Sequence, residues 1–100
     1  MLRQFFLGFI KIHILYHASR EPVYGVELLK ELGRHGYRLS PGTLYPTLHL
    51  LARDGYLSVE SKVVDGKVRK YYAITEQGLA ALDEARRKIA ELVEEVLRGK

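Results

Sequence analysis

The sequence predicts a mainly α-helical protein that carries a single two-stranded β ribbon. Apolar residues recur at helical spacing in four separate segments of the chain. Apolar and polar residues instead alternate on both sides of Asp65-Gly66, which is a favoured two-residue hairpin turn. The last quarter repeats apolar residues at spacings of three and four, a pattern typical of a coiled-coil seam. We therefore expect a ribbon inserted between the third and fourth helices.

The composition indicates a small single-domain protein and excludes several kinds of functional site. One hundred residues are the length of one domain with one core. The absence of Cys excludes disulfides, thiolate metal sites and thiol nucleophiles. Residues 1–75 hold eleven Lys or Arg and six Asp or Glu, whereas residues 76–100 hold five and six. No glycine-rich phosphate loop or triad spacing is recognisable, so we expect neither an enzyme nor a cofactor.

The first helix is expected from Leu2 to Tyr16 or His17 and is apolar over most of its surface. Its apolar run ends at Lys11 after six residues, whereas a membrane span needs roughly 20. We expect a buried helix in a cytoplasmic protein without a membrane partner. A helix that is apolar nearly all round is enclosed on several sides, which favours cover from a second subunit.

The third helix has two candidate starts. Ser40 as N-cap with Pro41 at the first helical position places Pro46 in the interior, where it breaks a backbone bond. Thr43 as N-cap places Pro46 in the first turn, where its missing N–H costs nothing. In both cases three leucines at helical spacing should pack inward. They are Leu44, Leu48 and Leu51.

The ribbon is expected from Leu57 to Ile74 around a primed two-residue turn. Period-two alternation gives it an inward and an outward side. The inward pairs are Leu57 with Ile74, Val59 with Tyr72, and Val63 with Val68. On the outward side Lys62 lies opposite Arg69, and this like-charge pair should cost stability on a bare ribbon. A polyanion along the ribbon would relieve that cost.

Two further helices complete the expected fold. One runs from Gly25 to His35, and the other is capped by Thr75 and continues to about Arg98. The last helix has little of its own domain to pack against, so its seam is expected to contact a partner chain. The seam residues are Leu82, Ala85, Ile89, Leu92 and Val96.

A helix followed by a cationic hairpin can place one element in a DNA groove and the other along the phosphates. Four segments of the chain also contain sequence motifs of a known protein family, including a Gly-Thr-Leu-Tyr-Pro core and an Arg-Lys-Tyr-Tyr run. They are Pro22 to Leu28, Ser40 to Leu48, Asp54 to Leu57 and Arg69 to Gly78. With these motifs, residues 1 to 98 resemble a PadR-type transcriptional regulator of the short-tailed branch, which has a single C-terminal helix.

The resemblance implies a winged helix-turn-helix with N- and C-terminal dimerisation helices. Residues 1–75 would form the DNA-binding domain and residues 76–100 the dimerisation helix, as one compact unit. The recognition helix would be Ser40 to Asp54 and the wing Leu57 to Ile74. The implied function is a homodimeric repressor that occludes a promoter at an inverted repeat and is relieved by a small-molecule effector. Some members bind planar drugs with a tryptophan pair, and this chain has no Trp.

The predicted contacts to double-stranded DNA come from the third helix and the ribbon. They are Ser40, Thr43, Tyr45, Thr47, His49, Arg53, Lys62, Lys67, Arg69 and Lys70. Simpler roles compete: the first two hydroxyls as helix caps, and the ribbon cations as a charged edge that blocks aggregation. The rival function is a winged-helix module that binds protein, whose affinity would respond little to salt.

The remaining candidate residues concern the dimer and its ligands. The predicted dimer interface comprises Phe5, Phe6, Phe9, Leu82, Ile89, Leu92 and Val96. An effector pocket between subunits would use Phe9, His13 and Tyr16, although plain packing explains the aromatic residues more simply. His13 and His17 have metal-ligand spacing on a helix, but no third ligand is apparent, so no metal site is predicted.

Overall fold

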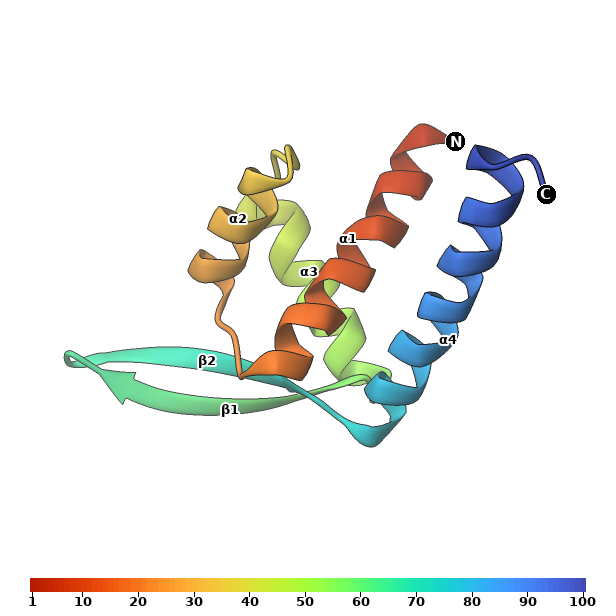
Figure 1. Cartoon of the computed structure of the whole chain (residues 1–100). Coiled ribbons are helices and arrows are strands. Elements are labelled where there is room, and N and C mark those ends of the chain that lie inside the picture. The colour runs from red at the N-terminus through yellow and green to blue at the C-terminus, as the bar shows by residue number, and fades with distance from the viewer.

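The computed structural model describes residues 1–100 and has the expected order of elements. These are helix α1 (Leu2–Arg20), α2 (Gly25–Arg34), α3 (Pro41–Arg53), strands β1 (Leu57–Val64) and β2 (Lys67–Ile74), α4 (Glu76–Leu92) and a π-helical turn η1 (Val93–Leu97). Helix α1 lies between the α2–α3 pair and α4, and α1 and α4 run side by side in opposite directions (Figure 1). Helix α1 extends beyond its predicted end to Arg20.

The core lies where the helices converge on the base of the ribbon. It contains thirteen buried apolar residues, which come from α1 to α4, from both strands and, in the case of Val23, from the connection before α2. The three leucines predicted on the inner face of α3 are all buried. They are joined by Ile14, Leu28 and Leu32, each almost completely enclosed. The inward face of α3 was therefore predicted correctly, and its opposite face is free for other contacts.

The structure decides between the two predicted starts of α3. Ser40 is the N-cap, with extended backbone angles, and Pro41 is the first helical residue. The backbone N–H groups of Thr43 and Leu44 both donate to the carbonyl of Ser40, at 3.0 and 3.1 Å. The first turn is thus already closed at Thr43, which excludes Thr43 as the cap. Pro46 lies inside the helix and removes one backbone hydrogen bond.

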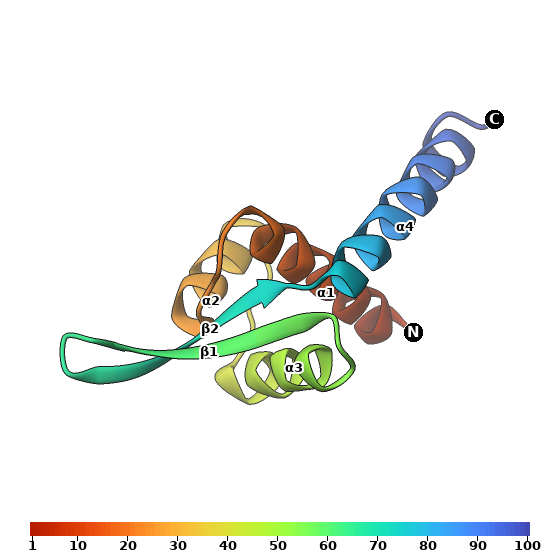
Figure 2. The ribbon, with the colours of Figure 1, turned by 90° about the horizontal axis from the view of Figure 1, so that it is seen from below.

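The ribbon has the predicted register, including Lys62 opposite Arg69. Asp65 and Gly66 both have positive φ, 51° and 75°, as a type I′ turn requires. Figure 2 shows the ribbon projecting beyond the helices. Val63 and Val68 near its tip are therefore 71% and 70% exposed, and the prediction that this pair faces the core is wrong. The helices end before they could cover the tip.

The junctions of the ribbon fix it to the helices. Val23, just before α2, exchanges two backbone hydrogen bonds with Tyr72, at 2.9 and 2.7 Å. At the other end the Thr75 hydroxyl accepts from the Gly78 N–H at 3.0 Å and donates to the Gly55 carbonyl at 2.6 Å. The predicted Thr75 cap is confirmed. None of the helices combines the length and apolar character that crossing a bilayer would require.

Candidate nucleic-acid interface

Helix α3 presents a polar and aromatic face on the side away from its buried leucines. Tyr45, His49 and Arg53 are all exposed on this face. Ser40 and Thr43 lie at its N-terminal end, where the Ser40 hydroxyl approaches that of Thr43 at 3.5 Å. Ser40 makes no side-chain cap bond. Its hydroxyl therefore stands beside the positive end of the helix dipole, which favours anionic ligands.

Thr47 does not share this exposed face. Its side chain is only 7% exposed, and its hydroxyl donates to the Thr43 carbonyl at 2.8 Å. The prediction that Thr47 points outward is wrong. Its position is one turn after Thr43 and one residue before the buried Leu48, so the helix rotates it toward the core, where its hydroxyl needs the backbone partner it finds.

Tyr45 is positioned by a close approach of α3 to the first residue of α2. A Cβ on Gly25 would lie 2.5 Å from the Cε1 atom of Tyr45 and 2.6 Å from its hydroxyl oxygen. Real atoms do not approach so closely, so any larger residue at position 25 would displace the ring. Gly25 was not among the predicted site residues. The glycine-tyrosine pair shows its role only once the two helices are brought together.

The outward side of the ribbon forms a small cluster of cations and tyrosines. The Lys62 ammonium lies 5.2 Å from the centre of the Tyr71 ring, and the Arg69 guanidinium 4.8 Å from that of Tyr24. The two rings are themselves 5.5 Å apart. A hydrogen bond with Tyr71, together with the nearby Tyr24 and Asp65, raises the pKa of Arg69 above its ordinary value. The shift favours the charged form of a guanidinium that is protonated at neutral pH in any case.

A groove of about 680 Å³ joins the exposed face of α3 to strand β2; we call it the recognition groove. Its walls include five of the predicted DNA-binding residues, namely Tyr45, His49, Lys67, Arg69 and Lys70. Tyr72 also lines the groove, and burial, followed by the nearby Tyr45, raises the pKa of this phenol, which stays neutral. Arg53 borders an adjoining hollow with Tyr45 and His49. The structure thus brings together residues from two separate motifs.

Most of the predicted dimer residues are exposed apolar side chains on α1, at the end of α4 and on η1. All three phenylalanines of α1 are exposed, with Phe5 and Phe9 stacked at 5.5 Å. Ile89, Leu92 and Val96 are also exposed. Leu82 is different: it is only 2% exposed in the single chain, so its assignment to the interface is wrong. It lies at the start of α4, where the helix packs on the core of its own domain.

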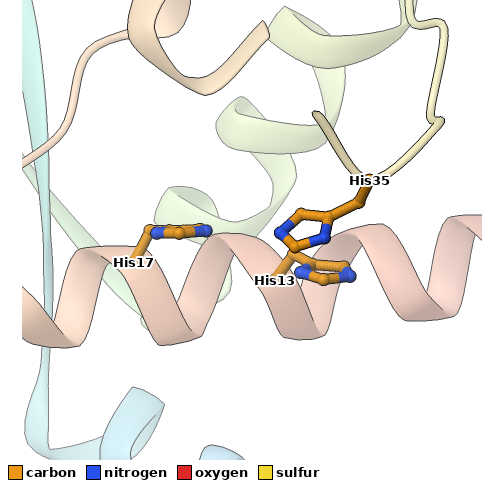
Figure 3. A group of neighbouring side chains, drawn as sticks. All are labelled: His13, His17 and His35. Atoms are coloured by element: carbon orange, nitrogen blue, oxygen red, sulfur yellow. The ribbon is translucent and has the colours of Figure 1, made fainter. Parts of the chain in front are cut away.

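A second groove of about 380 Å³ lies between α1, the segment after α2, and α4; we call it the histidine groove. It is lined by all three predicted effector-pocket residues, Phe9, His13 and Tyr16. It also contains His17 and His35, and the donor nitrogens of the three histidines lie within 4.8 Å of one another (Figure 3). His35 is a third imidazole that the sequence did not reveal, because it is distant along the chain.

The histidine side chains are packed together rather than scattered on the surface. The His13 and His35 rings are stacked with centroids 4.7 Å apart, and Tyr37 contacts the His13 ring edge-on at 5.3 Å. Burial, followed by the neighbouring imidazoles of His35 and His17, lowers the pKa of His13 below its ordinary value. The neutral imidazole of His13 is therefore favoured, and this is the form that can bind a metal.

Comparison with known proteins agrees with this architecture. Residues 14–84 match the transcriptional regulator PadR-like family. The chain is 53% identical to transcriptional regulator Rv3488 of Mycobacterium tuberculosis over 98% of its own length and 92% of that protein. A solved PadR-like transcription factor of Bacteroides fragilis is 31% identical, covers 98% of this chain and 96% of its own, and superposes with a TM-score of 0.84. A PadR-like regulator of Bacillus cereus is 34% identical, with a TM-score of 0.80 and coverages of 97% and 99%. The chain belongs to the PadR-like family of transcriptional regulators.

Proposed function

We propose that this protein is a homodimeric repressor, which binds an inverted-repeat operator in the cytoplasm and occludes a promoter. Regulators of this family act by binding rather than by catalysis. Each subunit would place α3 in a major groove and its ribbon along the neighbouring backbone. The two recognition helices would be spaced by one turn of DNA, roughly 34 Å.

The recognition groove is the observation that carries the proposal. Its two walls have different chemistry: Tyr45 and His49 on α3 offer groups that can read base edges, whereas Lys67, Arg69 and Lys70 on β2 form a row of cations suited to phosphate. This division corresponds to the separate roles of base contacts and phosphate contacts. Lys62 and the hydroxyls of Ser40 and Thr43 would add contacts at the edges of the same surface.

The apolar surface on α1 and α4 supports the dimer. Phe5, Phe6 and Phe9 on α1, and Ile89, Leu92 and Val96 at the C-terminal end, expose large side chains that a monomer would leave in water. These residues lie near the two termini, on the N-terminal half of α1, at the end of α4 and on η1, and the two helices diverge toward these ends (Figure 2). A second copy of the chain would bury them together. The histidine groove borders this surface and is the proposed effector site.

Selection of bound duplexes from a random DNA pool at physiological salt tests the proposed function. We expect an enriched inverted repeat with half-sites about one helical turn apart. The same selection with His49→Ala should change the preferred base at a fixed position in each half-site, because this side chain would reach base edges. Binding without any enriched sequence would contradict a specific operator. Absence of binding would favour the rival function, a protein-interaction module.

A further inference from the structure

The three histidines of the histidine groove form a cluster built from two distant segments. His13 and His17 are four residues apart on α1 and therefore share one face of that helix. His35 reaches over the same face from the end of α2 (Figure 3). The fourth histidine of the chain, His49, is on α3 and lines the recognition groove instead.

Backbone hydrogen bonds hold His35 in place. It is the C-cap of α2, and its N–H donates to the Leu32 carbonyl at 3.1 Å. The N–H of Tyr37 donates to the same carbonyl at 3.0 Å, while the Tyr37 ring packs against His13. The position of the third imidazole thus follows from the backbone, not only from a flexible side chain.

The donor set suits a divalent transition metal. Imidazole nitrogens are preferred ligands of zinc, nickel, cobalt and copper, whereas calcium and magnesium require oxygen. Two nitrogens on one tetrahedral zinc are about 3.3 Å apart, since each Zn–N bond is about 2.0–2.1 Å. The nitrogens here lie within 4.8 Å of one another, so metal binding would require the imidazoles to turn about their side-chain torsions and close this separation. Arg86 also lines the groove, but its charge is paired with Asp83 at 3.0 Å.

We propose that His13, His17 and His35 bind one divalent transition-metal ion of the zinc and nickel class. Three protein ligands leave a coordination position for water, as in open metal sites. The ion would join α1 to the segment between α2 and α3. α1 carries the proposed dimer surface, and the segment between α2 and α3 leads into the recognition helix. The position of α3 relative to the dimer would therefore depend on the concentration of the metal ion. This regulatory part rests on the proposed function, whereas the binding of metal does not.

Calorimetric titration of Zn²⁺ into chelator-treated protein without a polyhistidine tag tests the site directly. We expect one ion per chain, and absorption bands of tetrahedral Co²⁺ when cobalt is used in place of zinc. His35→Gln should weaken zinc binding by about tenfold or more, since it removes one of three ligands. His49→Gln is the matched control for a surface histidine, and we expect it to bind zinc like the unmodified chain.

Either of two results would overturn the metal site. One is the absence of saturable zinc and cobalt binding by the unmodified chain, which needs no variant to interpret. The other is unchanged affinity in His35→Gln, whose side chain is exposed and whose fold can be checked by circular dichroism. Either outcome would leave the cluster as packed aromatic rings only.

The regulatory part is tested with the selected operator, by measuring its dissociation constant with and without Zn²⁺. We expect a change of about fivefold or more in the unmodified chain and none in His35→Gln. Equal affinities in both states would overturn the coupling to DNA. If no DNA were bound in either state, the proposed function would fail, whereas the metal site would still be decided by the calorimetry alone.

Discussion

At the scale of single residues, the ribbon shows how two like charges are accommodated. Lys62 and Arg69 lie opposite each other, as the sequence predicts, and such a pair destabilises a bare ribbon. In the folded chain each cation lies over a tyrosine ring. An exposed cation–π contact contributes about 0.5–1 kcal/mol, which offsets the repulsion without any polyanion. The cations are thereby held in a defined position before any ligand binds.

Replacing Arg69 by alanine tests the role of these cations. We expect Arg69→Ala to weaken binding to all DNA sequences alike, because a wing cation that contacts phosphate reads no base. The slope of log affinity against log salt should fall by about one, the effect of losing one phosphate contact. Electrophoretic or fluorescence binding assays over a range of salt concentrations measure both quantities.

Lys100→Ala is the control for Arg69→Ala, because it removes one exposed cation at the C-terminus, far from the ribbon (Figure 1). Its salt slope should equal that of the unmodified chain. A changed sequence preference in Arg69→Ala, with an unchanged slope, would instead assign this side chain to base recognition.

At the scale of elements, the turn between the ribbon and α4 connects three parts of the chain. Thr75 caps α4 through its bond with the Gly78 N–H and also donates to the Gly55 carbonyl just after α3. Its own N–H donates to the Tyr56 carbonyl at 3.2 Å. One hydroxyl thus links the segment after α3 to the start of α4.

Thr75→Ala should therefore destabilise the whole domain. Loss of an N-cap costs about 1 kcal/mol, which lowers the Tm of a domain of this size by about 4–8 °C. Thr75→Ser keeps the hydroxyl and should retain most of the stability. Thermal unfolding followed by circular dichroism measures both variants, and equal losses in alanine and serine variants would show that the methyl group, not the hydroxyl, matters.

The elements and their pairing were largely predictable because periodicity and turn chemistry are local. The ribbon register followed from one dipeptide, and the Thr75 cap from one residue before a helical pattern. Periodicity does not show how far neighbouring elements extend, so the exposed Val63 and Val68 at the ribbon tip were misplaced. The approach of His35 to α1 depends on how two helices pack, which no local pattern contains.

At the scale of the whole molecule, the single chain is elongated, with extents of 54 × 29 × 20 Å. The ribbon projects at one side and the end of α4 at the other (Figure 2). Leu82, at the start of the predicted seam, is already buried by its own domain, whereas Ile89, Leu92 and Val96 become exposed along the helix. The part of the seam that remains available for a second chain therefore begins at Ile89.

Charging this exposed part of the seam should separate the subunits. Ile89→Glu places a carboxylate in the proposed apolar interface, where burying an unpaired charge is strongly unfavourable. We expect monomers by sedimentation velocity and a large loss of operator affinity, because each monomer would hold only one half-site. Ile89 is 41% exposed in the single chain, so the variant should still fold.

Ala80→Glu is the matched control for Ile89→Glu. At about 100° per residue, position 80 lies on the opposite side of α4 from position 89, and its side chain is exposed. We expect the control to remain dimeric, and an Ile89→Glu variant that also remained dimeric would place the interface elsewhere, on the phenylalanines of α1 alone.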